Sequence, residues 1–243
     1  MQPSEPPGWS EETSRLFMNY ARYFVPEREL QMRIITGLLS ARDGPALILD
    51  LCCGEGLLDE LILDTFPAFT LLGLDGSEEM LQQAGKRLAR FGSRFSRKKF
   101  DLAGMDWRTP ALPPAAVVSS LAIHHLTGAQ KQALFVDIFG MLAEKGMFII
   151  ADVIEHPDET GRRLAAEDLD ESVRKRSLEL DGNTGAFDFF QREDWNIFRH
   201  LDPQDIDKPS PLFDQLKWLE RAGFAQIDVH WMLAGHAIFS ASK

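Results

Sequence analysis

The sequence predicts an α/β fold, built on a doubly wound, mostly parallel sheet of seven strands that ends in an antiparallel hairpin. From residue 46 onward, short apolar runs alternate with helix-forming segments, and this alternation is typical of a parallel sheet with helices on both faces. Near the end of the chain, strand-like runs at 225–233 and 236–242 flank Ala234–Gly235, which favours a hairpin turn.

Two helices are predicted ahead of the sheet, at about 11–23 and 26–39. Pro26 suits the first turn of the second helix, because the N–H that proline lacks has no helical partner there. One face of this helix is apolar and carries Ile34, Ile35, Leu38 and Leu39. We therefore divide the chain into an N-terminal helical extension at 1–44 and a main domain at 45–243.

The parallel part of the sheet is assigned to the apolar runs at 46–51, 69–74, 95–101, 115–121 and 146–153. The connecting helices are predicted at 56–65, 77–91 and 129–143. Residues 154–210 interrupt the alternation with a charged helix at 158–180 and an aromatic segment at 187–201. Because a last helix at 212–224 leads back into the hairpin, 154–210 is predicted to be a helical insertion.

The most informative motif is ALILDLCCGEGLL at 46–58, an apolar run that reaches Asp50 and then turns through Gly54 and Gly56. Glycine has no Cβ and tolerates positive φ, so such an elbow lets the backbone approach a ligand closely. A second apolar run ends at Asp75, 25 positions after Asp50. An acid at about this spacing is placed to hold ribose hydroxyls, so the two segments together indicate a nucleoside-type cofactor.

At these residues the chain resembles the class I S-adenosylmethionine-dependent methyltransferases. The resemblance is carried by DLCCGEG at 50–56, GLDGSEEML at 73–81, Asp106–Trp107, VVSSLAIHHL at 117–126 and the closing run at 223–243. It implies a Rossmann-like methyltransferase fold whose sheet ends in an antiparallel hairpin. It also implies S-adenosylmethionine as cofactor, S-adenosylhomocysteine as product, and transfer of a methyl group to an O, N or C nucleophile of a small molecule.

The resemblance further implies roles for residues at the first two strand ends. Gly54 and Gly56 would meet the methionine portion of the cofactor, and Asp50 would hold its ammonium group. Asp75 would accept hydrogen bonds from both ribose hydroxyls, since a carboxylate offers two acceptor oxygens. Asp50 and Asp75 could instead cap the helices that follow them.

Other residues would complete the cofactor site. Gly76 and Met80 would line the adenine pocket, although Met80 could equally be core. Asp106 would accept from the adenine amino group with Trp107 at the ring edge, unless this segment is a surface loop. The residues after the fourth strand that would meet the cofactor are Ser120, Leu121 and His125.

One departure from the family pattern concerns Cys52, which stands where the family usually has glycine. Cysteine behaves as a small hydrophobe, so we expect Cys52 to fit at the strand end beside the cofactor. The only other cysteine is Cys53, and adjacent cysteines rarely form a disulfide. Without a disulfide framework or a CxxC pattern, the chain is expected in the reducing cytoplasm.

Three further side chains could serve the reaction. His124 is a candidate general base, because an unperturbed pKa of about 6.5 suits proton removal at neutral pH. Alternatively His124 caps a loop, since transfer to an already nucleophilic atom needs no base. In similar enzymes an N-terminal helix closes over the cofactor, so Tyr20 and Arg28 could contact it, the latter by gripping a carboxylate. An exposed arginine and a half-buried tyrosine are the alternative.

Composition narrows the possible partners. A formal net charge of −11 argues against nucleic acid, whose binding depends on basic side chains. No segment has the composition of a signal peptide, and no apolar run approaches the roughly 20 residues that span a bilayer. The histidines lack a ligand spacing such as HxxxH, so we expect no catalytic metal. The acceptor and the oligomeric state are left open.

Three other functions remain as alternatives. An NAD-dependent oxidoreductase would share the strand, elbow and acid, but Asp59 stands where the third glycine of GxGxxG should fall. A catalytically silent cofactor-binding or regulatory module is also compatible, because methyl transfer leaves few obligatory residues. A tRNA-modifying enzyme would require a basic patch, which the linear sequence does not indicate.

Overall fold

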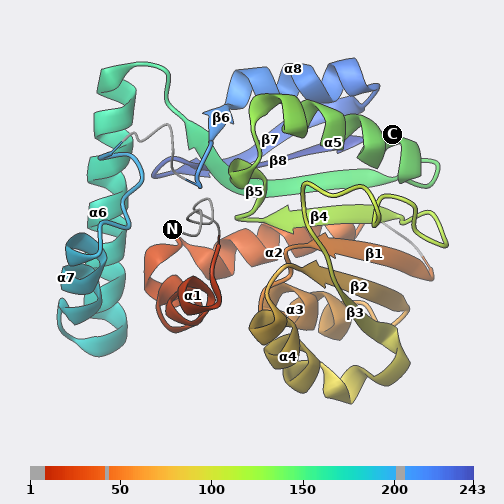
Figure 1. Cartoon of the computed structure of the whole chain (residues 1–243), viewed down its shortest axis with the longest axis horizontal. Coiled ribbons are helices and arrows are strands. Elements are labelled where there is room, and N and C mark those ends of the chain that lie inside the picture. Colours follow the sequence, from red (N-terminus) through yellow and green to blue (C-terminus); the bar gives the residue numbers. More distant parts are fainter. Residues whose placement is uncertain (1–8, 42–43, 201–205) are drawn as a thin grey trace, which may run out of the picture.

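The computed structural model describes residues 9–41, 44–200 and 206–243. Residues 1–8 and 42–43 of the predicted extension and residues 201–205 of the predicted insertion lie outside the described part. At the centre is a sheet with the strand order β3-β2-β1-β4-β5-β8-β7 (Figure 1). This order confirms the predicted doubly wound arrangement.

The sheet has the predicted parallel core and antiparallel edge. Its parallel strands are β1 (Ala46–Leu51), β2 (Phe69–Asp75), β3 (Phe95–Lys99), β4 (Ala116–Ser120) and β5 (Met147–Glu155). The antiparallel strands are β7 (Ala225–Leu233) and β8 (His236–Ser242), of which β8 pairs with β5. An unpredicted eighth strand, the two-residue β6 (Ser210–Pro211), runs parallel to the end of β5.

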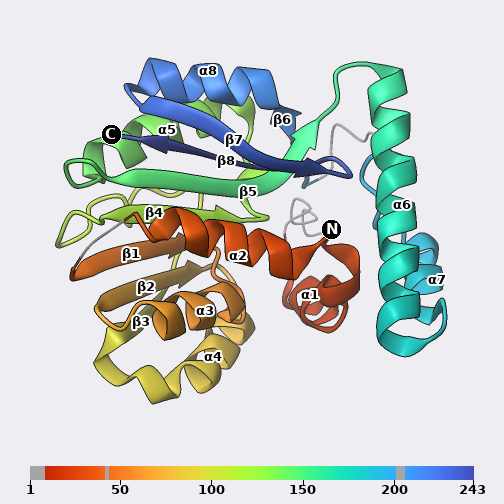
Figure 2. The ribbon, with the colours of Figure 1, turned by 180° about the vertical axis from the view of Figure 1, so that it is seen from behind.

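Helices cover both faces of the sheet (Figures 1 and 2). They are α2 (Arg28–Leu39), α3 (Leu57–Thr65), α4 (Glu78–Arg87), α5 (Gly128–Met141) and α8 (Leu212–Ala222). On one face, Ile48 of β1 packs in a cluster with residues of α2, α3 and α4. On the other, the neighbouring Leu49 packs with residues of α5 and α8, as the alternation of a strand requires.

A second group of helices stands beside the sheet. It comprises α1 (Glu11–Phe24) and, from the predicted insertion, α6 (Glu159–Asp181) and α7 (Gly185–Arg192) (Figure 2). A third apolar cluster joins Phe24 of α1 to Val173 of α6 and Phe190 of α7. The N-terminal extension and the insertion are therefore packed against each other.

Local sequence explains where several elements end. The predicted helix at 77–91 stops at Arg87 and continues as a 3₁₀ segment, Ala89–Arg94, in which Gly92 has φ +56° and breaks the helix. Thr127 and Gln130 form a capping box that starts α5.

Among the described residues, no helix combines the length and apolar composition needed to cross a bilayer.

Candidate active site

Three adjoining cavities lie at the carboxyl ends of the parallel strands, where chain order reverses between β1 and β4. We call them the main cavity, of about 470 Å³, the Arg28 cavity, of about 70 Å³, and the aromatic cavity, of about 100 Å³. Phe17 of α1 and Leu121 at the tip of β4 line all three. The cavities therefore meet at one point beneath α1.

The elbow after β1 lies at the wall of the main cavity. Cys52 has φ +60°, a left-handed conformation that costs a non-glycine residue about 1–2 kcal/mol. The backbone N–H of Cys53 donates to Leu74 O at 2.9 Å and holds the elbow against β2. Position 52 thus needs the conformation that glycine adopts freely, and cysteine adopts it here under strain.

Asp75 is fixed at the end of β2 by two backbone donors. Its Oδ2 accepts from the Gly54 N–H and its Oδ1 from the Ser77 N–H, each at 2.8 Å. Burial raises the pKa of Asp75 in spite of these hydrogen bonds. Ser77, rather than Asp75, caps α4 through its hydroxyl. Asp75 therefore lines the main cavity with a carboxylate whose orientation is set in advance.

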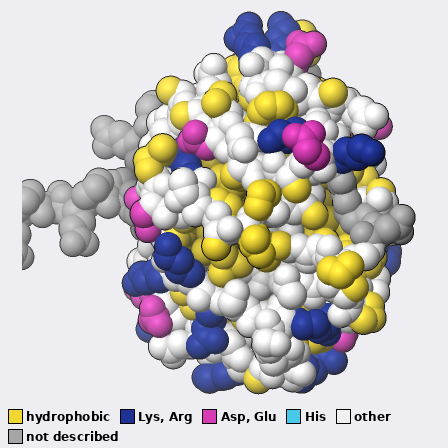
Figure 3. Space-filling view, turned by 90° about the vertical axis from the view of Figure 1, so that its right-hand side faces the viewer, with side chains coloured by type: hydrophobic (Ala, Val, Ile, Leu, Met, Phe, Trp, Pro, Cys, Tyr) yellow, Lys and Arg dark blue, Asp and Glu magenta, His cyan; other side chains and the backbone are white. Residues whose placement is uncertain are grey.

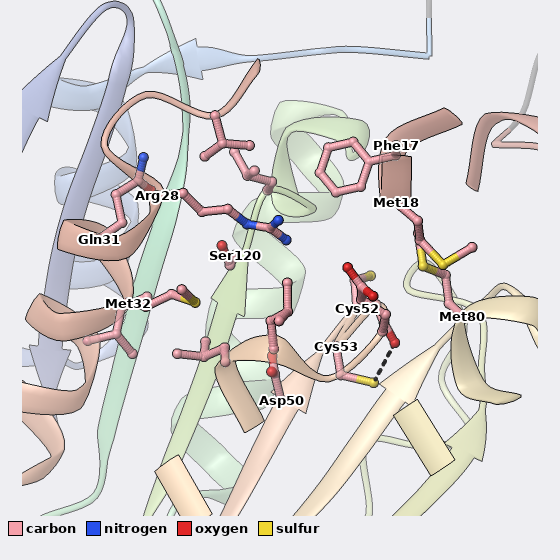
Figure 4. Close-up of a pocket in the computed structure, with 17 residues that line it drawn as sticks. Phe17, Met18, Arg28, Gln31, Met32, Asp50, Cys52, Cys53, Met80 and Ser120 are labelled. Atoms are coloured by element: carbon pink, nitrogen blue, oxygen red, sulfur yellow. Dashed lines mark hydrogen bonds between the residues drawn. The ribbon is translucent and has the colours of Figure 1, made fainter. Parts of the chain in front are cut away.

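The Arg28 cavity is lined by one base, Arg28, and two acids, Asp50 and Glu55. Asp50 is buried and its Oδ1 has no hydrogen-bond partner among the described residues. Burial and the neighbouring Asp59 raise the pKa of Asp50 well above its usual range. Figure 4 shows the guanidinium of Arg28 projecting from α2 into the cavity above Ser120. Within the described chain, this guanidinium makes no hydrogen bond or ion pair, and burial lowers its pKa.

The comparisons with known proteins agree with this geometry. Residues 48–146 match a family described as a methyltransferase domain. A carboxy-S-adenosyl-L-methionine synthase of Nitratiruptor is 23% identical over 201 residues, which cover 81% of this chain and 75% of the relative. Residues 48–146 therefore form a methyltransferase domain, and the relatives support a class I S-adenosylmethionine-dependent methyltransferase. Its cofactor is S-adenosylmethionine, and the NAD-dependent alternative is set aside.

Other relatives of this methyltransferase share shorter regions or only the fold. A trans-aconitate 2-methyltransferase of Acidovorax is 31% identical over 134 residues, which cover 55% of this chain and 48% of the relative. The chain thus spans about half the length of that relative. An O-methyltransferase family protein from Burkholderia thailandensis superposes with a TM-score of 0.67 at 15% identity, covering 100% of this chain and 65% of that one.

A phosphoethanolamine N-methyltransferase of Haemonchus contortus, solved with S-adenosyl-L-methionine, gives a TM-score of 0.66 at 15% identity. That alignment covers 96% of the methyltransferase and 58% of the Haemonchus chain. At such identities these likenesses concern the fold alone.

The structure brings most of the residues predicted for the site to the three cavities. They are Arg28, Asp50, Cys52, Gly54, Asp75, Gly76, Met80, Ser120, Leu121, His124 and His125. Gly56 is not among them. It has φ +79° and faces α4, where an added Cβ would lie 2.8 Å from Cδ1 of Leu88. The structure therefore assigns Gly56 to helix packing.

Three other predicted residues also lie outside these cavities. The Asp106 side chain is 69% exposed and its Oδ2 lies 3.6 Å from Nζ of Lys98. Trp107 is buried against Phe100. The Tyr20 ring stacks on Phe189 of α7 with centroids 4.1 Å apart. The main cavity is instead lined, after β3, by Asp101, Leu102 and Ala103.

His124 does not have the surroundings of a general base. Its Nδ1 donates to Asp152 Oδ1 at 2.5 Å, and its Nε2 lies 3.4 Å from Asp207 Oδ1. Burial disfavours a charged ring, but the two carboxylates outweigh it and raise the pKa of His124 to about 10. A protonated imidazole has no lone pair to accept a proton, so these surroundings do not favour His124 as the general base. Asp152 and Asp207 are 28 and 83 positions away from His124 in sequence, so no local pattern could predict these two contacts.

The aromatic cavity has an apolar body and a polar end. Its apolar walls come from α1, α6, α7 and the segment after α7, and include Phe24, Leu169, Phe190, Trp195 and Phe198. Its polar end contains His124, Asp207 and His236. Burial lowers the pKa of His236 to about 4, so this ring is neutral at neutral pH.

The N-terminal helix is held over the main cavity by a contact that the sequence did not suggest. Glu11 Oε1 accepts from the Glu78 N–H at 2.9 Å, and Oε2 accepts from the Ser77 hydroxyl at 2.5 Å. An acid at the amino end of a helix is stabilised by the helix dipole. Glu11 thus docks α1 on α4 directly beside Asp75.

Proposed function

We propose that this methyltransferase methylates a hydroxyl or carboxyl oxygen of a small molecule that has a largely apolar body. The observation that carries the proposal is the aromatic cavity, which joins the main cavity at Phe17 and Leu121 and ends in polar side chains. Apolar walls with a few placed polar groups are typical of small-molecule sites. The similarity to trans-aconitate 2-methyltransferases, whose named substrate is a carboxylic acid, supports an oxygen acceptor.

The residues of the main and Arg28 cavities fit the cofactor in chemistry. Asp75 would face the ribose hydroxyls, and Asp101 would take the place predicted for Asp106 at the adenine amino group. At the methionine end, the unpartnered Oδ1 of Asp50 suits an ammonium group and the unpartnered guanidinium of Arg28 suits a carboxylate. The zwitterionic amino acid end of the cofactor would therefore pair with both side chains at once.

The remaining cavity residues would complete the same surface. Contacts with the cofactor are assigned to Cys52, Gly54, Gly76, Met80, Ser120, Leu121 and His125. When bound, S-adenosylmethionine supplies an electrophilic methyl group on its sulfonium. The chain's own contribution is to align an acceptor with that group and to exclude water, which can carry much of the rate.

We assign the roof of the site to two segments, the extension at 1–44 and the insertion at 154–210. Their described parts pack together around Phe24 and Phe190, and α1 also docks on α4 through Glu11. We propose that this roof sets acceptor specificity. The two free thiols, Cys52 and Cys53, support a reducing cytoplasmic location.

A nucleic-acid acceptor receives no support from charge. On the face shown in Figure 3, Lys and Arg side chains are scattered around the rim and are accompanied by Asp and Glu. Figure 3 shows the end of the molecule away from α6 and α7, so it is the formal net charge of −11 that argues against a nucleic-acid acceptor.

The test begins with calorimetric titration of the purified protein with S-adenosylmethionine, S-adenosylhomocysteine and NAD. We expect the first two to bind and NAD not to bind. Asp75→Asn should weaken binding strongly, whereas Asp106→Asn, as the matched control, should not. Equal effects of the two changes would refute the ribose assignment.

Methyl transfer is then measured with a panel of small hydroxyl and carboxyl compounds and, separately, amines and tRNA. Turnover only with oxygen acceptors supports the proposal. Turnover only with amines or tRNA refutes it, and cofactor binding without any turnover favours the silent module.

A further inference from the structure

We propose that His124, His125 and Asp207 form a binding site for a divalent transition-metal ion in the wall between the main and aromatic cavities. Each residue offers one ligand atom, and the three atoms lie within 4.8 Å of one another. His125 lines the main cavity, while His124 and Asp207 line the aromatic cavity. An ion held here would be reachable from the acceptor side.

The distances between the ligand atoms suit a shared ion. Asp207 Oδ1 lies 3.4 Å from His124 Nε2 and 3.0 Å from His125 Nδ1. Ligands bound to zinc at about 2.0–2.2 Å stand roughly 3.0–3.5 Å from one another. Two of the three ligand pairs therefore already have the spacing of a shared ion, and the third lies within 4.8 Å.

Two of these atoms have no partner outside the cluster among the described residues. His125 Nδ1 and Asp207 Oδ1 are both buried and, among the described residues, neither makes a hydrogen bond. They approach one another at ion-pair distance but without hydrogen-bond geometry. Asp207 Oδ1 is paired in the same way with His124 Nε2 at 3.4 Å, so a bound ion would replace this imidazole–carboxylate cluster by bonds from all three atoms to the metal.

The environment of His124 is that of a metal-binding histidine. Its Nδ1 donates to Asp152 Oδ1 at 2.5 Å, and Asp152 is fixed by the backbone N–H groups of His124 and Val153. A carboxylate on the far nitrogen orients the ring and makes the other nitrogen a better ligand. That other nitrogen, Nε2, is the one that points towards Asp207.

Charge favours the same conclusion. Without an ion, Asp152 and Asp207 keep the His124 ring protonated, and a divalent ion bound at Nε2 would displace that proton and balance the two carboxylates in its place. Two imidazoles and one carboxylate form a ligand set that suits Zn²⁺ with a fourth position open to substrate. If the proposed function holds, that position would take the acceptor oxygen and stabilise its ionised form.

The sequence did not predict this site, because its histidines lack a helical ligand spacing. Two ligands are consecutive residues of the short 3₁₀ helix after β4, Ile123–His125. The third comes from the far end of the insertion, 82 positions after His125. Only the fold brings them together.

The proposal is tested by metal binding without any cofactor or acceptor. Protein treated with chelator is titrated with Co²⁺, and the visible absorption of the bound ion is recorded. We expect one saturable site with the bands of nitrogen and oxygen ligation, from which one equivalent of Zn²⁺ displaces the Co²⁺.

Asp207→Asn and His125→Asn should abolish the saturable signal. Asp152→Asn should weaken Co²⁺ binding by about 10–100-fold, as loss of a carboxylate behind a metal ligand usually does. His200→Asn, at an exposed histidine, is the matched control and should bind as the wild type does.

Absence of saturable Co²⁺ binding to the wild type would overturn the proposal. So would a signal that survives both Asp207→Asn and His125→Asn in protein whose far-ultraviolet circular dichroism is native. Calorimetry with S-adenosylhomocysteine on the same samples reports the cofactor site separately. A failure of the metal site is therefore distinguishable from a failure of the proposed methyl transfer.

Discussion

Replacing Gly56 by alanine separates a packing role from a cofactor role at the elbow. Gly56 has φ +79°, and forcing an L-residue into this region costs about 1–2 kcal/mol. The new Cβ would lie 2.8 Å from Leu88 Cδ1 and 3.3 Å from the Ala84 Cβ, and overpacking of this kind costs about 1–3 kcal/mol. Alanine also restricts the conformations of the unfolded chain, which stabilises the folded protein by about 0.4–1 kcal/mol.

We therefore expect Gly56→Ala to lower the free energy of unfolding by about 1–5 kcal/mol, as the balance of these three contributions. The measurement is urea denaturation followed by circular dichroism. Gly37→Ala is the matched control, because Gly37 lies on the exposed face of α2 with nothing within 4 Å of an added Cβ. Helix propensity predicts that this change stabilises the protein, by up to about 1 kcal/mol.

The two substitutions should thus have opposite signs. Folded Gly56→Ala protein should still bind S-adenosylhomocysteine with wild-type affinity, because Gly56 does not line the cavities. Wild-type stability of Gly56→Ala would refute the packing argument. Native stability with lost binding would instead restore the cofactor role expected from the sequence.

Three further outcomes follow from the same structure. Arg28→Ala should weaken S-adenosylhomocysteine binding about 10–100-fold, because it removes a charged hydrogen bond worth about 1.5–3 kcal/mol. Arg33→Ala, on the exposed side of α2, is the control and should leave the affinity unchanged. Both affinities are measured by calorimetry. Glu11→Gln should speed amide hydrogen exchange in α1, whereas the exposed Glu12→Gln should leave it unchanged; equal rates for both would mean that Glu11 does not anchor the helix. Burial raises the pKa of Asp59 to about 7, above the roughly 4 of an unfolded chain, so the folded state holds the proton more tightly. The unfolding free energy of the wild type should therefore fall as pH rises from about 4 to about 7, and Asp59→Asn should flatten this fall in denaturation measured across that range.

Much of the fold could be predicted from local patterns in the sequence. The limits of β1, β7 and β8 agree with the predicted ranges, because period and turn chemistry are properties of short segments. Asp75 was found for the same reason, since it follows a strand and precedes a helix start. Such features need no knowledge of distant parts of the chain.

The residues whose surroundings differ from the prediction are those whose positions depend on tertiary structure. Asp101 and Asp106 lie in one loop, and only its fold decides which of them faces the cavity. The Gly104 N–H donates to Asp101 O at 2.9 Å, and this turn carries Asp106 away to solvent. Similarly, the surroundings of His124 depend on Asp152 and Asp207, which tertiary structure alone brings near.

The position of α1 has a consequence for the order in which ligands arrive. At one end Glu11 holds the start of α4 beside Asp75, at the other Tyr20 stacks on Phe189 of α7, and Phe17 between them lines all three cavities. A cofactor that orders α1 thereby also orders a wall of the aromatic cavity, where we place the acceptor. Kinetically, this linkage leads us to expect ordered addition, with S-adenosylmethionine first and the acceptor second.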